Sequence, residues 1–278
     1  MKPHEGFDPA TAELDPAVGG QALATAFEVA AEHGVEVHGV WSAGDVDTAI
    51  ATSTGIAVAD RVTDAFMKTT CFAPDGRSGW ASQSGVGLSE LAPRAIAEAA
   101  AIRADGTFAE RRDVAKLEPG EYPVVLAPAA IAEMLDWLAL GAFNGLAHAE
   151  GRGALVDRLG TRVAAASINI ADSPRYPRTL PRAFDAEGVP KAPLPLIQDG
   201  VATNVVHDTR SAALVEGAHS TGHALAPGGS SWGPYASRRE MSRVRRMQTR
   251  PRRNGAGDPC RSRAPQTAFR VGPAGSRA

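Results

Sequence analysis

The chain has 278 residues, 44% of them apolar, and a net charge of −2. This length and apolar content suffice for one large domain or two smaller ones, each with a buried core. The sequence has no apolar run long enough to span a membrane, no signal-peptide pattern at its N-terminus, and only two cysteines, Cys71 and Cys260. These features argue against a membrane protein and a disulfide-rich secreted protein, so we expect a soluble cytoplasmic protein.

Elements in the first part of the chain are predicted from apolar spacing and turn residues. A helix is expected over Gly19–Gly34, where Leu23, Phe27 and Ala30 recur at helical spacing and a glycine ends the run. Alternating apolar residues then predict an antiparallel, hairpin-rich unit followed by a second helix. Its expected parts are a strand over Val35–Trp41, hairpins turning at Ser53–Gly55 and at Pro74–Gly76, and a helix beginning near Pro93.

The second part is expected to contain helices, strands and loops after a turn-forming linker, Lys116–Tyr122. The predicted elements are a short buried strand over Pro123–Pro128, an apolar helix over Ala129–Ala147, a strand over Arg162–Asp172, a hairpin turning at Asp199–Gly200, and a short helix over Arg210–Ala218. Because strands and helices occur in separate runs, the pattern indicates an α+β fold.

Residues 236–278 differ in composition from the rest of the chain. They contain twelve Arg, no Lys and two acidic residues, a net charge of +10, whereas residues 1–235 carry −12. A basic arm could bind nucleic acid through phosphate contacts. The Arg-, Pro-, Ala- and Gly-rich composition without lysine is, however, typical of GC-rich DNA read in a shifted frame. We therefore expect a frameshifted, disordered tail, and a nucleic-acid-binding arm is the alternative.

No catalytic set is evident from residue types alone. His219 and His223 are spaced i, i+4, as in a metal-binding helix. The intervening Ser220, Thr221 and Gly222 are poor helix formers, so a structural loop is favoured over a metal pair. The sequence contains no G-x-S-x-G elbow, P-loop or dinucleotide-binding motif.

Three other sets of side chains have plain structural interpretations. His207 and Asp208 could be a base and its orienting acid, but neighbours on a strand point to opposite faces, so a surface turn is favoured. Cys71 is expected to be a packed thiol. Glu133 and Asp136, one helical turn apart, could perform acid–base chemistry, but a helix face that meets solvent is favoured.

Several segments, taken in order, resemble the TldD/PmbA family of bacterial metalloproteases, also called modulators of DNA gyrase. They are GDVDTAIATSTGIAV, LEPGEYPVVLAPAAIAEMLDWLA, ALVDRLGTRVA, AFDAEGVP, LIQDGVATNVVHDTRSAAL and STGHALAPGG. The resemblance implies the remnant of an N-terminal α/β domain with a linker helix over residues 1–115. It further implies a truncated, β-rich C-terminal domain over residues 116–235, followed by the tail over residues 236–278.

The resemblance also implies a function. Members of the family act as cytoplasmic heterodimers that degrade or trim peptides. A TldD-type chain holds zinc through an H-E-x-x-x-H helix, and a PmbA/TldE-type partner lacks that motif. In this chain Asp136, Trp137 and Gly141 occupy the positions of the motif, and tryptophan and glycine offer zinc no lone pair.

The resemblance is therefore to the non-catalytic branch of the family. It implies no catalytic or metal-binding residues in this chain, no cofactor of its own, and zinc only in a TldD-type partner. His219, Gly222 and His223 would line the substrate channel or form a structural loop. The alternatives are a nucleic-acid- or gyrase-associated protein acting through the tail, and a chain without a stable fold. Nucleic-acid binding is not expected, because Phe269 is the only aromatic residue of the tail that could stack on bases.

Overall fold

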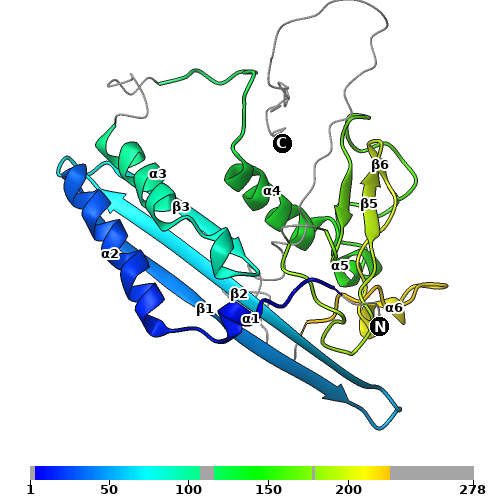
Figure 1. Ribbon diagram of the computed structural model, residues 1–278. Coiled ribbons are helices and arrows are strands. Elements are labelled where there is room, and N and C mark those ends of the chain that lie inside the picture. Colours follow the sequence, from blue (N-terminus) through cyan, green and yellow to red (C-terminus); the bar gives the residue numbers. More distant parts are fainter. Residues whose placement is uncertain (1–3, 107–115, 177–178, 226–278) are drawn as a thin grey trace, which may run out of the picture.

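The computed structural model describes residues 4–106, 116–176 and 179–225 (Figure 1). They form a mixed α+β structure with two antiparallel sheets of three strands each. The helices are α1 (Pro9–Ala12), α2 (Pro16–Glu32), α3 (Pro93–Asp105), α4 (Pro128–Gly141), α5 (Gly145–Ala149) and α6 (Thr209–Ala212), with a 3₁₀ turn η1 (Leu88–Glu90). The strands are β1 (Glu36–Ala51), β2 (Ala57–Phe72), β3 (Ser78–Gly85), β4 (Ile170–Asp172), β5 (Leu194–Gln198) and β6 (Val201–Ala202). The α+β prediction is confirmed for this part of the chain.

The first sheet is a meander in the order β1-β2-β3. β1 and β2 stay in one register, from Glu36 opposite Phe72 to Ala51 opposite Ala57, and form a long hairpin arm. The two predicted turns are confirmed, since β1 ends before Ser53–Gly55 and β2 ends before Pro74–Gly76. The predicted strand over Val35–Trp41 is the start of β1, which continues to the end of the arm.

The two long helices begin and end where their sequences supply caps. The Asp15 side chain accepts a hydrogen bond from the Ala17 amide, and Pro16 occupies the first turn of α2. This helix therefore begins three residues before the predicted start. α3 begins at Pro93 as predicted and ends at Asp105, where Gly106 with its positive φ terminates it.

Both helices cover the same face of the first sheet (Figure 1). The core between them is built largely of alanine, with Val29 from α2, Ile96 from α3 and Met67 from β2. Small side chains let the helices approach the sheet closely. At Gly79 a Cβ atom would lie 2.4 Å from the Ala100 carbonyl oxygen, so only glycine fits at this contact.

The predicted helix over Ala129–Ala147 is two helices in the structure. α4 ends at Gly141, and the Asn144 side chain accepts a hydrogen bond from the Ala147 amide to start α5. Phe143, between the two helices, is buried in the second core with Leu196 and Ile170. Phe143 therefore reaches the second core from the short connection between the two helices.

Three further predictions for the second part are wrong. Residues 123–127 do not form a strand, and Val125 is 81% exposed. Of the strand predicted over Arg162–Asp172, only Ile170–Asp172 forms a strand, while Arg162 makes an isolated antiparallel bridge with Val201, and α6 ends at Ala212. The described residues from 116 onward have three strands, of three, five and two residues. The residues in these stretches favour strands, but a strand also requires a neighbouring strand to receive its backbone hydrogen bonds.

The predicted hairpin at Asp199–Gly200 is confirmed, because β5 and β6 pair across it and both turn residues have positive φ. None of the helices in the described part of the chain has the length and apolar character that crossing a bilayer requires. The predicted tail over residues 236–278 lies outside the described residues.

Candidate functional site

The loop that carries His219, Gly222 and His223 is held by a buried carboxylate. His223 Nε2 donates to Asp172 Oδ2 over 2.8 Å, and Lys191 Nζ lies 3.7 Å from the same oxygen. Lys191 also donates to the Gly222 carbonyl oxygen over 2.6 Å. The side chains of Asp172 and Lys191 are almost fully buried. We call Asp172, Lys191 and His223 the buried charge cluster.

The members of this cluster come from three separate places in the chain. Asp172 ends β4, Lys191 lies just before β5, and His223 lies in the loop after α6. The loop is also bound to the Phe184–Pro190 turn, because Asp185 Oδ2 accepts a hydrogen bond from the Ala224 amide. The other Asp185 oxygen, Oδ1, accepts from the amides of Glu187 and Val189. One loop is thereby joined to two others through carboxylates.

The three sequence-predicted loop residues lie in different environments. His219 is exposed to solvent, and Gly222 is buried with a positive φ. His223 is part-buried, and its second ring nitrogen, Nδ1, lies 2.9 Å from Thr221 Oγ1. The structure thus brings His223 into the buried charge cluster, places the Gly222 carbonyl oxygen in contact with Lys191 of that cluster, and leaves His219 outside it. Asp172, Lys191 and Asp185 were not identified from the sequence.

His207, which the sequence places on a surface turn, is buried instead. Its ring Nδ1 lies 3.1 Å from Ser211 Oγ, and its amide donates to Thr221 Oγ1 over 2.8 Å. Asp208 caps α6 by accepting from the Ser211 amide. The surface-turn interpretation is therefore wrong for His207: the turn exists, but α6 and the loop after it cover the ring.

Burial lowers the pKa of His207 below its ordinary value, and the nearby His148 and His219 lower it further against the opposing effect of Asp208. The folded protein therefore binds a proton at this ring less readily than the unfolded chain. Below the ordinary pKa of histidine, about 6.5, the unfolded state holds more protons, so the free energy of unfolding falls as the pH decreases.

We predict that a His207→Asn variant, which keeps a polar atom near the Nδ1 position, has a weaker pH dependence of stability than the unsubstituted protein between pH 7 and pH 5. Urea unfolding curves at several pH values measure this difference. Equal pH dependence in the two proteins would contradict the assignment to His207.

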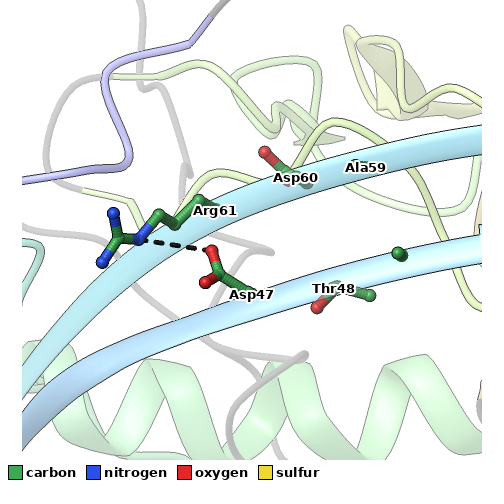
Figure 2. A pocket seen from close by; sticks show the side chains of 6 residues that line it. Asp47, Thr48, Ala59, Asp60 and Arg61 are labelled. Atoms are coloured by element: carbon green, nitrogen blue, oxygen red, sulfur yellow. Dashed lines mark ion pairs between the residues drawn. The ribbon is translucent and has the colours of Figure 1, made fainter.

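A shallow, open hollow lies on the β1–β2 arm (Figure 2). Its volume is about 360 Å³, and it is lined by Asp47, Thr48, Ala49, Ala59, Asp60 and Arg61. Figure 2 shows Arg61 turned toward Asp47, with Nε and Oδ1 3.2 Å apart. Asp60 accepts from His4 Nε2 over 2.9 Å and from the Ala183 amide over 2.8 Å. Asp47, Asp60 and Arg61 thus each have a partner within the chain, and Asp60 joins the arm to His4 and Ala183.

The residues of α4 lie mostly toward solvent. Leu135 is the one buried residue of the helix, and Trp137 is 69% exposed. Glu133 and Gly141 are also exposed, and Asp136 is part-buried. The interpretation of Glu133 as part of a solvent-facing helix surface is confirmed.

Two domains of one protein family match this chain. The PmbA/TldA metallopeptidase central domain matches residues 8–106, and the PmbA/TldA metallopeptidase C-terminal domain matches residues 119–242. The chain belongs to the PmbA/TldD metallopeptidase family. A comparison with curated protein sequences gives no significant match.

Solved structures share the fold of this PmbA/TldD family member. A candidate modulator of a DNA gyrase from Thermotoga maritima is 22% identical to this chain, with a TM-score of 0.71. The match covers 82% of this chain and 53% of the Thermotoga chain. TldE from Thermococcus kodakarensis is 22% identical, with a TM-score of 0.68, and the match covers 83% of this chain and 54% of the TldE chain. A candidate modulator of DNA gyrase from Bacteroides thetaiotaomicron is 19% identical, with a TM-score of 0.62, and the match covers 80% of this chain and 52% of the Bacteroides chain. The chain spans about half the length of these structures.

The family name implies a metal, and the side chains of α4 do not fit zinc. Zinc in proteins is held by imidazole, thiolate or carboxylate groups that converge on one point. Asp136 is the only such group among Asp136, Trp137 and Gly141. Within residues 4–106, 116–176 and 179–225, no three His, Cys, Asp or Glu side chains are placed to hold a metal ion together. In this PmbA/TldD family member the described residues therefore supply no zinc site.

Proposed function

We propose that this chain is a non-catalytic subunit of a TldD/TldE-like zinc metallopeptidase that acts on peptides in the cytoplasm. Membership of the PmbA/TldD metallopeptidase family and structural similarity to TldE support the proposal. The single observation that carries it is the composition of α4, where Asp136 and Gly141 stand at the two histidine positions of the motif and Trp137 stands at its glutamate position.

In this proposal the zinc and its bound water belong to a TldD-type subunit. Zinc activates that water for attack on a peptide carbonyl. This chain contributes the walls that orient an extended peptide, and the loop around His219, Gly222 and His223 is the candidate wall. The loop suits that role because it is hydrogen-bonded to Asp172, Lys191 and Asp185, which fix its position. His219 remains exposed at its surface.

We expect the purified full chain alone to contain well below one equivalent of zinc and to show no peptidase activity. Adding a zinc-loaded TldD-type subunit from the same genome should produce activity on unfolded peptides. Elemental analysis and a fluorogenic-peptide assay measure both quantities.

The control is a TldD-type subunit in which one histidine of its H-E-x-x-x-H motif is replaced by alanine. That pair should be inactive although this chain is unchanged. Stoichiometric zinc in this chain by itself, or activity that persists with the control subunit, would contradict the proposal.

A further inference from the structure

Strand β1 forms an edge of the first sheet (Figure 1). In the described part of the chain its 16 residues pair only with β2, and no backbone hydrogen bond joins them to another segment. None of these residues is buried. Natural proteins usually keep edge strands short or interrupt them with bulges or proline, because an open edge can pair with another chain. β1 is long, contains no proline and keeps one register throughout.

Alternate residues of β1 direct their backbone groups toward this open edge. In an antiparallel pair every second residue exchanges hydrogen bonds with its partner, and the residues between them direct N–H and C=O groups the other way. At the tip of the arm the Thr52 amide donates to the Ile56 carbonyl oxygen over 2.9 Å, in the register of the two strands. Even-numbered residues of β1 therefore bond to β2, and odd-numbered residues face outward. The four outward-facing residues nearest the tip are all exposed, and they are Asp45, Asp47, Ala49 and Ala51.

The segments along the open edge are acidic. Residues 4–60, which form α1, α2, β1 and the start of β2, contain ten acidic side chains and neither lysine nor arginine. Both helices contact β1, so their charges lie beside it. A strand that joins this edge therefore meets a negative surface, which attracts basic side chains and repels acidic ones.

Basic side chains on neighbouring elements neutralise part of this charge. Arg61 of β2 forms an ion pair with Asp47 (Figure 2) and a second one with another aspartate of β1. Arg94 of α3 pairs with a glutamate of α2. Lys68 of β2 lies over an aromatic ring of β3. These three cations stand against ten carboxylates, so the surface around β1 keeps a net negative charge.

We propose that the open edge of β1 binds an extended, basic peptide, which adds to the first sheet as a further strand. An extended polypeptide offers the alternating donors and acceptors that a strand edge binds. The negative surface favours lysine and arginine and repels nucleic acid. A second copy of this chain, joined edge to edge, would place two acidic β1 strands side by side. The inference names a class of peptide for the proposed function but does not depend on it, because this chain alone carries the edge.

The test measures binding of a short fluorescein-labelled peptide, in which lysine alternates with strand-favouring threonine, to the full chain by fluorescence anisotropy. Two twins of the peptide separate charge from strand pairing. Glutamate in place of lysine removes the charge complementarity. Methyl groups on alternate backbone nitrogens remove the donors to the edge and leave the charge unchanged. Each change should raise Kd by about tenfold or more, because several charge contacts or hydrogen bonds are lost.

A proline substitution locates the site on the protein. Ala49→Pro removes one outward N–H from the open edge and keeps the hydrogen bonds to β2, a position where edge strands tolerate proline. It should weaken binding of the lysine peptide several-fold. The matched control is Ser82→Pro on β3, an exposed residue whose N–H faces the opposite edge of the same sheet by the same alternation. The control should leave Kd within twofold, and circular dichroism melts show whether both variants fold.

A charge variant keeps the test decisive if Ala49→Pro fails to fold. Asp47→Lys reverses a charge that is 73% exposed, and it should weaken binding several-fold at low salt, with the difference lost at high salt. Equal binding of the methylated peptide would show charge attraction without strand pairing. Unchanged binding by both arm variants would place the site elsewhere. Either result overturns the inference, as does the absence of binding to the full chain.

Two further results would identify a different occupant and also overturn the inference. Binding that occurs only after residues 236–278 are removed would assign the edge to this chain's own arginine-rich segment. Self-association that Ala49→Pro abolishes would assign it to a second copy. None of these measurements involves zinc or a TldD-type subunit, so the proposed function stands if this inference fails.

Discussion

Replacing Asp172 with alanine is expected to lower the free energy of unfolding by about 3–5 kcal/mol, the range seen when one partner of a buried ion pair is removed. The Asp172 carboxylate accepts a hydrogen bond from His223 and faces the Lys191 ammonium in a nearly water-free site. Without it, the Lys191 charge stays buried and loses the group that compensates it. Urea unfolding followed by circular dichroism measures the change.

The matched control is Asp47→Ala on the β1–β2 arm. Asp47 also forms an ion pair, with Arg61, but its side chain is 73% exposed and water replaces the lost contact. Its removal should therefore change stability far less than the removal of Asp172. Replacing both Asp172 and Lys191, by leucine and methionine, should restore much of the lost stability, because an apolar pair needs no charge compensation. Similar effects of the two single substitutions would show that the buried charge cluster does not organise the fold.

A Gly79→Val variant should be destabilised by about 3 kcal/mol, the upper part of the usual range for overpacking. A Cβ atom on Gly79 would lie 2.4 Å from the Ala100 carbonyl oxygen and 2.8 Å from the Ala104 amide nitrogen. Both are backbone atoms of α3, so the whole helix must move away from the sheet. The thermal unfolding midpoint and the free energy of unfolding in urea both report the loss.

Gly44→Val is the control for this substitution. Gly44 lies on β1 of the same sheet, and no heavy atom lies within 4 Å of the position its Cβ would take. Valine also favours strands more than glycine does. This variant should therefore keep the stability of the unsubstituted protein to within about 0.5 kcal/mol, and an equal loss at both positions would mean that packing against α3 is not the cause.

Local signals predicted the elements whose determinants are close in sequence. The turns at Ser53–Gly55, Pro74–Gly76 and Asp199–Gly200, and the start of α3 at Pro93, depend on a few adjacent residues. Cys71 was likewise expected to be packed. It is buried in the first core, and its burial raises the pKa of the thiol.

The wrong predictions concern features that depend on contacts with other parts of the chain, which local sequence patterns do not reveal. The apolar residues of 123–127 have strand propensity, but a strand also needs a neighbour to receive its backbone hydrogen bonds, and these residues do not pair as a strand in the structure. The break after Gly141 was missed because the apolar spacing continues across it, while the Asn144 cap starts a separate helix. His207 was placed at the surface because its cover comes from Thr221 and the loop that follows α6.

The sequence by itself determined the α+β class, most turns and helix starts, and the family resemblance, because each depends on residue types at short spacing. It also places Asp136, Trp137 and Gly141 on α4, and the family resemblance implies that these three residues stand at the positions of the H-E-x-x-x-H motif. Only the tertiary structure decided which charged groups meet. Asp172, Lys191 and His223 span 52 positions of the chain, and their buried charge cluster exists because packing of β4, β5 and the 220–225 loop removes water from all three at once.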